Sequence, residues 1–174
     1  MMPLSSFMLI GMILFGLSGM LQGWYKEFLG TVSVFLAIFV ITLAEKYVPY
    51  LAQMATDPNQ AKTLFFIRVL IFAVIVFFGY QTPRWSISRR NIGAFQSALL
   101  GALLGALNGY LIVGMLWHYM DAAHYPWPAF VRPPLADDAL SNEMLHYLPS
   151  VFLGVPGIYI AAAILFVFVI VVFI

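Results

Sequence analysis

Three histidines are the residues whose chemistry can be tested most directly by their spacing: His118, His124 and His146. No two of them are four residues apart and none lies in a His-Glu-x-x-His sequence, so the pattern of a zinc hydrolase is missing. The chain has no cysteine, which excludes disulfides, thiolate metal sites and cysteine nucleophiles. Motifs for an activated serine, a phosphate loop or a dinucleotide loop are also missing. The sequence therefore predicts a protein that is not an enzyme and holds no metal.

His118 leaves one alternative open. Gly114 lies four residues before it, and a small residue one turn before a histidine leaves room for a flat tetrapyrrole whose metal the imidazole ligates. The plainer interpretation is a histidine at a helix end that bonds to water or to the backbone. We expect no cofactor besides lipid, with a tetrapyrrole at His118 only if the chain is part of a pigment complex.

The amino-acid composition indicates what kind of protein carries these histidines. Of 174 residues, 63% are hydrophobic and 9% are charged, whereas a soluble domain has about 25% charged residues. The net charge of +1 provides no basic surface for nucleic acid. A soluble domain and a disordered chain are both excluded. The lipid bilayer is therefore the first expected partner.

Stretches without charge are long enough to cross a bilayer, which takes about 20 apolar residues in a helix. Open β-structure is excluded because its edge amides would lack partners in lipid. We predict an all-α, polytopic membrane protein with one transmembrane domain over residues 1–174. Five spans are expected, near Leu4–Gln22, Phe28–Lys46, Thr63–Tyr80, Phe95–Tyr119 and Pro156–Ile174.

Ionisable residues are rare in these spans. We expect no Asp or Glu inside any span, which argues against proton- or sodium-coupled transport by this chain alone. Arg68 is the exception, about five residues in from one end of the third span. It can reach the outer headgroups by snorkelling, pair with an acid such as Asp57, Glu45 or Asp121, or bind an anion or lipid phosphate.

The orientation follows from the basic residues between the third and fourth spans. This loop holds Arg84, Arg89 and Arg90 and no acid, so it should face the cytoplasm and can bind lipid headgroups or acids. The expected topology in a bacterial inner membrane has the N-terminus outside and the C-terminus inside.

Residues 121–156 then form an extracytoplasmic loop. Within it we expect a short amphipathic helix from Asp137 to Leu148, with Leu140, Met144 and Leu148 as its apolar stripe. That helix lies either on the lipid surface or against the membrane domain.

Small residues recur every four positions in the fourth span. A row of this kind forms a groove in which another helix backbone approaches closely, either within the chain or in another subunit. The row consists of Gly93, Ser97, Gly101, Gly105 and Gly109.

A shorter pattern of glycine, any residue, leucine, amide, glycine and aromatic occurs twice. It spans residues 19–24, with Gly19, Gln22 and Gly23, and again residues 105–110, with Asn108. Chance or a shared packing need explains the likeness better than an inverted repeat. Gln22 and Asn108 can hydrogen-bond across helix contacts for about 1 kcal/mol each.

The stretches 19–29 and 99–110 resemble the colicin V production protein (CvpA) family of bacterial inner-membrane proteins. The first is similar to the family's turn of glycines, basic residues and Glu, and the second to its glycine-rich fourth helix. The family usually has Arg where this chain has Gln22 and Asn108. The resemblance implies a role in toxin export or envelope upkeep, with no agreed biochemical activity.

Three functions follow as hypotheses. The first is a non-enzymatic membrane protein of the colicin V production type, which acts by helix packing with other membrane protein subunits. The second is an accessory subunit of a respiratory or photosynthetic complex, which contacts pigment or lipid. The third is a small channel or transporter component.

Overall fold

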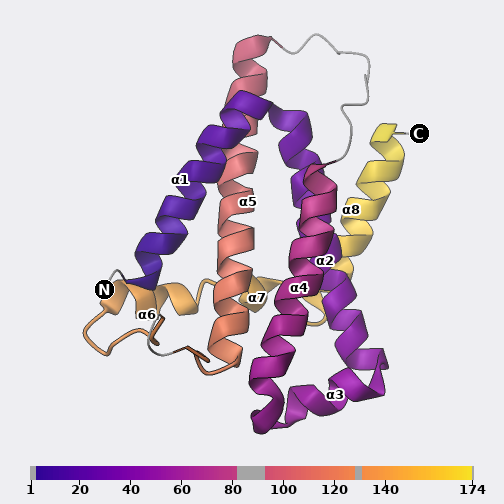
Figure 1. The fold of residues 1–174 in the computed structure, drawn as a ribbon. Coiled ribbons are helices and arrows are strands. Elements are labelled where there is room, and N and C mark those ends of the chain that lie inside the picture. Colours follow the sequence, from indigo (N-terminus) through magenta and orange to yellow (C-terminus); the bar gives the residue numbers. More distant parts are fainter. Residues whose placement is uncertain (1–2, 82–92, 128–130, 174) are drawn as a thin grey trace.

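The computed structural model describes residues 3–81, 93–127 and 131–173 (Figure 1). These residues form α-helices and one short 3-10 helix, with no strand among them, as the prediction of an all-α protein requires. The helices are α1 Leu4–Gln22, α2 Trp24–Tyr47, α3 Pro49–Thr56, η1 Pro58–Gln60, α4 Ala61–Tyr80, α5 Ala94–Ala122, α6 Ala139–Leu145, α7 Pro149–Phe152 and α8 Gly157–Phe173.

Four helices of the described chain are long and apolar enough to cross a membrane: α1, α2, α4 together with η1, and α5. A fifth span results if α6, α7 and the first part of α8 are taken together as one span bent by 57°. The expected all-α, polytopic membrane protein is therefore confirmed. The structure allows four or five spans, and the expected count of about five is the larger of these two numbers.

Gly23 reverses the chain between α1 and α2 by itself. Its φ of 85° lies in the left-handed region that glycine adopts without a steric penalty, and α2 begins at the next residue. We expected a longer turn with the second span starting at Phe28. The tight reversal instead places Lys26 and Glu27 inside the first turn of α2.

Two short helices differ from the expectation. Helix α3 follows α2 after Val48, with Pro49 at its first position, where the missing N–H costs nothing; we expected a loop here. Helix α6 is shorter than the expected 137–148. Asp138 caps it by accepting a hydrogen bond from the Ser141 amide, but Pro149 starts the separate helix α7.

The α6 segment packs on the membrane domain. Ser141 is fully buried, and its hydroxyl lies 3.0 Å from the hydroxyl of Ser5 in α1. Leu148 is buried with Met8 and Trp117, whereas Leu140 of the expected apolar stripe is 52% exposed. This segment was expected either on the lipid surface or against the membrane domain, and the structure shows it against the membrane domain.

The long helices form a bundle in which α1 and α5 lie side by side and α2 packs on α4 and α5 (Figure 1). The N-terminal end of α1, α3 and α6 lie at one end of this bundle. The α1–α2 turn, the last turn of α4 and the C-terminal end of α8 lie at the other (Figure 1). The largest apolar core is contributed mainly by three helices: Val34, Ala37, Ile38 and Ile41 from α2, Phe65, Phe72 and Val76 from α4, and Leu111, Met115 and Tyr119 from α5.

Candidate functional site

Glu27 is the only fully buried charged residue of the described chain, with 0% of its surface exposed. It lies in the first turn of α2, directly after the α1–α2 reversal. Gly19 of α1 covers it so closely that a Cβ on that glycine would lie 3.0 Å from the Glu27 Cγ. The expectation that the spans carry no acid is therefore wrong for α2, which holds Glu45 near its end and, because the turn is a single residue, also Glu27 in its first turn.

Three uncharged side chains surround Glu27, and together these four residues are called the Glu27 cluster. The Tyr80 hydroxyl donates to Glu27 Oε2 over 3.0 Å, and Asn108 Nδ2 donates to the same oxygen over 2.8 Å. Asn108 Nδ2 also lies 2.8 Å from the Glu27 carbonyl oxygen and 2.9 Å from the Tyr80 hydroxyl. Thr31 completes the cluster by donating to Asn108 Oδ1 over 2.8 Å.

The cluster ties three helices together, because Glu27 and Thr31 lie on α2, Tyr80 on α4 and Asn108 on α5. One carboxylate oxygen, Oε2, accepts two hydrogen bonds, while the other, Oε1, is buried without a partner. A buried carboxylate with an unbonded oxygen is costly, because its lost hydration is only partly replaced. An ionisable group held this way inside a membrane domain is usually functional.

The two amides of the repeated sequence pattern behave differently. Asn108 makes the contacts between helices described above. Gln22 bonds within its own helix, donating to the Ser18 hydroxyl four residues back, and its Oε1 is buried without a partner. The difference arises because Asn108 is in the middle of α5, whereas Gln22 is the last residue of α1.

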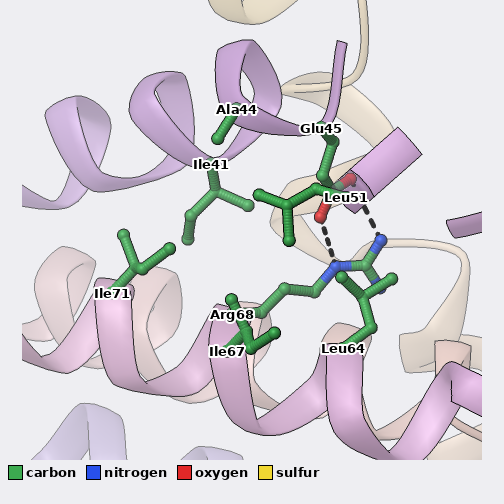
Figure 2. Close-up of a pocket in the computed structure, with 8 residues that line it drawn as sticks. All are labelled: Ile41, Ala44, Glu45, Leu51, Leu64, Ile67, Arg68 and Ile71. Carbon is green, nitrogen blue, oxygen red and sulfur yellow. Dashed lines mark hydrogen bonds and ion pairs between the residues drawn. The ribbon is translucent and has the colours of Figure 1, made fainter. Parts of the chain in front are cut away.

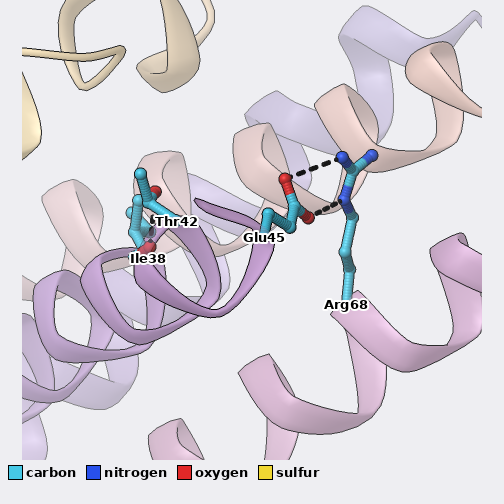
Figure 3. Close-up of polar contacts among 4 residues, drawn as sticks. All are labelled: Ile38, Thr42, Glu45 and Arg68. Carbon is cyan, nitrogen blue, oxygen red and sulfur yellow. Dashed lines mark hydrogen bonds and ion pairs between the residues drawn. The ribbon is translucent and has the colours of Figure 1, made fainter. Parts of the chain in front are cut away.

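A second polar contact lies towards the other end of α2 and α4. Arg68 donates from Nε to Glu45 Oε1 over 2.5 Å and from Nη2 to Glu45 Oε2 over 3.0 Å. Figure 3 shows this paired geometry one turn beyond Thr42, whose hydroxyl donates to the Ile38 carbonyl. Of the roles considered for Arg68, the structure thus shows an ion pair, with Glu45 among the three acids considered.

Apolar side chains enclose the Arg68–Glu45 pair. Ile41, Leu51, Leu64, Ile67 and Ile71 line a pocket of about 10 Å³ beside it (Figure 2). The pocket is too small for a ligand larger than about one water molecule. The pair therefore has apolar side chains on this side and joins α2 to α4.

A larger cavity of about 200 Å³ lies where α3 meets α4 and the end of α5. Arg68, Asp57 and His124 are its ionisable lining residues. The Asn59 backbone amide, helped by the Gln60 side chain, holds the pKa of Asp57 below its usual range. Beyond α5, burial raises the pKa of Tyr125 to about 12, although Trp117 donates a hydrogen bond to its hydroxyl.

His118 lies on α5 beside this region. Its neighbour Tyr119 places its ring 5.7 Å from the Arg68 guanidinium. The space next to Gly114 is filled by the ring of Pro149 in α7, which a Cβ on that glycine would overlap at 2.5 Å. The space beside Gly114 is thus occupied by α7.

The glycines of α5 lie against α1. A Cβ on Gly101 would overlap the Gly19 carbonyl oxygen, and one on Gly105 would overlap that of Phe15. At Gly109 the same atom would lie 2.7 Å from the Gly11 oxygen. The groove is therefore filled within the chain.

The first two members of the row lie outside the tightest contact. Ser97 places its hydroxyl 3.1 Å from where a Cβ on Gly23 would be. A Cβ on Gly93 would meet only the side chain of its own neighbour Gln96, at 3.9 Å. Arg84, Arg89 and Arg90, expected to bind lipid or acids, lie outside the described residues.

The sequence model of a known family, described as colicin V production protein, matches residues 4–148. The chain belongs to this family. The match includes the Glu27 cluster and the Arg68–Glu45 pair and ends before α8. No curated protein and no solved structure matches the chain significantly. The chain is therefore a multi-pass membrane protein of the colicin V production type.

Sequence reasoning missed Glu27, Thr31 and Tyr80 as site residues. A signal was present, because Thr31 follows Glu27 by four residues and so lies on the same helix face. This spacing was not used because the second span was expected to begin at Phe28, which left Glu27 outside the helix. That Tyr80 meets Glu27 is a tertiary contact between residues 53 apart, which spacing does not reveal.

Proposed function

We propose that this protein is a non-enzymatic component of the bacterial inner membrane that supports toxin export or envelope function by packing with other membrane proteins. The family match over residues 4–148 carries the proposal. The absence of cysteine and of the common catalytic motifs from the sequence supports a non-enzymatic role. The expected orientation, with the N-terminus outside and the C-terminus in the cytoplasm, is part of the same proposal.

The surface offered to a partner is the lipid-facing side of α1 and α5, because their glycine faces are used against each other. Large apolar side chains cover that outer side: Ile13, Leu14, Leu17 and Leu21 from α1, and Leu99, Leu103 and Leu107 from α5. Such residues contact either lipid tails or another helix. Dispersion contacts then decide which neighbour is preferred.

Photo-crosslinking in native membranes tests the packing role. A photoreactive residue at Leu103, which is 62% exposed, should crosslink to another membrane protein. The same residue at Leu111 on the same helix, which is 4% exposed, should give no such product. Crosslinks only to lipid at Leu103, together with a lone monomer in gentle detergent, would contradict the proposal.

One observation favours a second candidate, a channel or transporter component. The buried Glu27 cluster supplies the intramembrane carboxylate that the sequence seemed to lack. Ion flux across liposomes that contain the purified protein tests this role. Flux equal to that of empty liposomes would exclude transport by the chain alone.

A further inference from the structure

We infer that Glu27 is a proton-binding site of the membrane domain. The inference does not depend on the packing role proposed above, or on whether the protein moves any solute. It starts from the unbonded Oε1 atom, which is fully enclosed by protein. A proton is the ligand that fits there, because Glu27 is 0% exposed and its Oε1 atom is enclosed by protein, which leaves no free surface for a larger ion.

Among the residues that the structure describes, the side chains that touch the Glu27 carboxyl group carry no charge. Helix α1 has no ionisable side chain at all over Leu4–Gln22. Helix α4 presents the Tyr80 hydroxyl, and α5 presents the uncharged amide of Asn108. The ionisable neighbours within α2 are Tyr25 and Lys26, which precede Glu27 in the same helical turn.

Protonation of Oε1 leaves the hydrogen bonds described for the cluster intact. Tyr80 and Asn108 both donate to Oε2, so neither bond needs the oxygen that takes the proton. The proton comes from water and adds to the carboxylate, which becomes a neutral carboxylic acid; release returns it to water. The neutral form no longer has the cost of a charge in an apolar interior.

Tyr80 differs from the rest of the Glu27 cluster in its burial. It is the last residue of α4 and is half-buried, whereas Glu27, Asn108 and Gly19 are buried. Of the residues bonded to the carboxyl group, Tyr80 is thus the one with part of its surface exposed at that end of the bundle. A change of charge at Glu27 acts directly on α2, α4 and α5, which the cluster joins, and on α1, whose Gly19 covers it.

Infrared difference spectroscopy of the protein in phosphatidylcholine liposomes tests the inference. Acidification of the wild-type protein should produce a carbonyl band of a carboxylic acid in an apolar environment. Glu27→Gln should lose this band. Glu45→Gln is the matched control, since it removes the other glutamate of α2, and it should retain the band. No band in the wild-type protein, or an unchanged band in Glu27→Gln, would overturn the inference.

Two further variants serve if Glu27→Gln does not fold, which circular dichroism would reveal. Glu27→Asp should shift the band, because the shorter side chain changes the environment of the carboxyl group. Tyr80→Phe should also shift it, because Oε2 loses one donor. A band at the same position in both variants would assign the proton to another group and overturn the inference.

Discussion

Asn108 makes polar contacts to two other helices with one side chain. Its amide nitrogen reaches the Glu27 carboxylate, the Glu27 carbonyl and the Tyr80 hydroxyl, and its oxygen accepts from Thr31. In a membrane interior such groups find no water to replace a lost partner. At the scale of single residues, the stability of the domain therefore depends on whether each buried polar atom keeps its partner.

Removal of the Asn108 side chain should destabilise the bundle. Asn108→Ala leaves Glu27 Oε2 with one donor and the Thr31 hydroxyl without this acceptor. We expect the free energy of unfolding in detergent to fall by about 1–3 kcal/mol. The control is Gln53→Ala, which removes an exposed amide on α3. Equal melting of the two variants would show that the cluster contributes nothing to stability.

The Arg68–Glu45 pair makes a second prediction at this scale. Arg68→Met and Glu45→Gln each leave the other charge partly buried, because the paired side chains are only 16% and 24% exposed. The double variant removes both charges, so its loss of stability should be smaller than the sum of the single losses. We expect a coupling of about 0.5–3 kcal/mol in a double-mutant cycle. Strictly additive losses would show that the two groups do not interact.

The contact between α1 and α5 depends on missing side chains. Gly101, Gly105 and Gly109 let the two backbones approach, and Gly11 and Gly19 of α1 face them. Helices in lipid gain little from the hydrophobic effect, so close dispersion contacts hold them together. The importance of a glycine depends on its position along the row, since a Cβ on Gly93 would make only an ordinary contact with the Gln96 side chain, at 3.9 Å.

A methyl group at Gly105 should disrupt this contact. Its Cβ meets the backbone of Phe15 and Gly16, which moves only if the whole helix shifts. We expect Gly105→Ala to lower the free energy of unfolding by about 1–3 kcal/mol through overpacking. Gly93→Ala, from the same row, should cause no comparable loss. If the two variants melt alike, the row is not the packing face.

At the scale of the whole molecule, the arrangement of the helices links the positions of distant segments. Helices α3 and α6 lie at the same end of the bundle as the start of α1, and the C-terminal end of α8 lies at the other (Figure 1). If the side of the membrane is measured for one of these segments, the sides of the others follow from the structure. The basic loop between α4 and α5 predicts that the α3 and α6 end faces outwards.

Cysteine labelling of intact cells tests this topology, because the chain has no cysteine of its own. Asp137→Cys and Asn59→Cys, both exposed and both at the expected outer end, should react with an impermeant maleimide. Ser88→Cys, in the basic loop, should react only after the membrane is opened. Labelling of Ser88→Cys alone in intact cells would invert the topology.

The sequence by itself predicted the fold class, the rough limits of four spans, a fifth span as the upper count, and the family. These properties depend on composition and on runs of apolar residues, which are local. It also indicated the glycine row, because spacing of four residues defines a helix face. It left open whether that row meets α1 or another subunit.

The tertiary structure decided which polar groups meet. The partner of Arg68 is one of three acids that the sequence allowed, and only the approach of α2 to α4 selects Glu45. Glu27 was expected in a turn, but the structure buries it. The reason is that Gly23 alone reverses the chain and that the helices pack around the Glu27 side chain. Contacts of this kind join residues dozens of positions apart, and a local pattern carries no information about such distances.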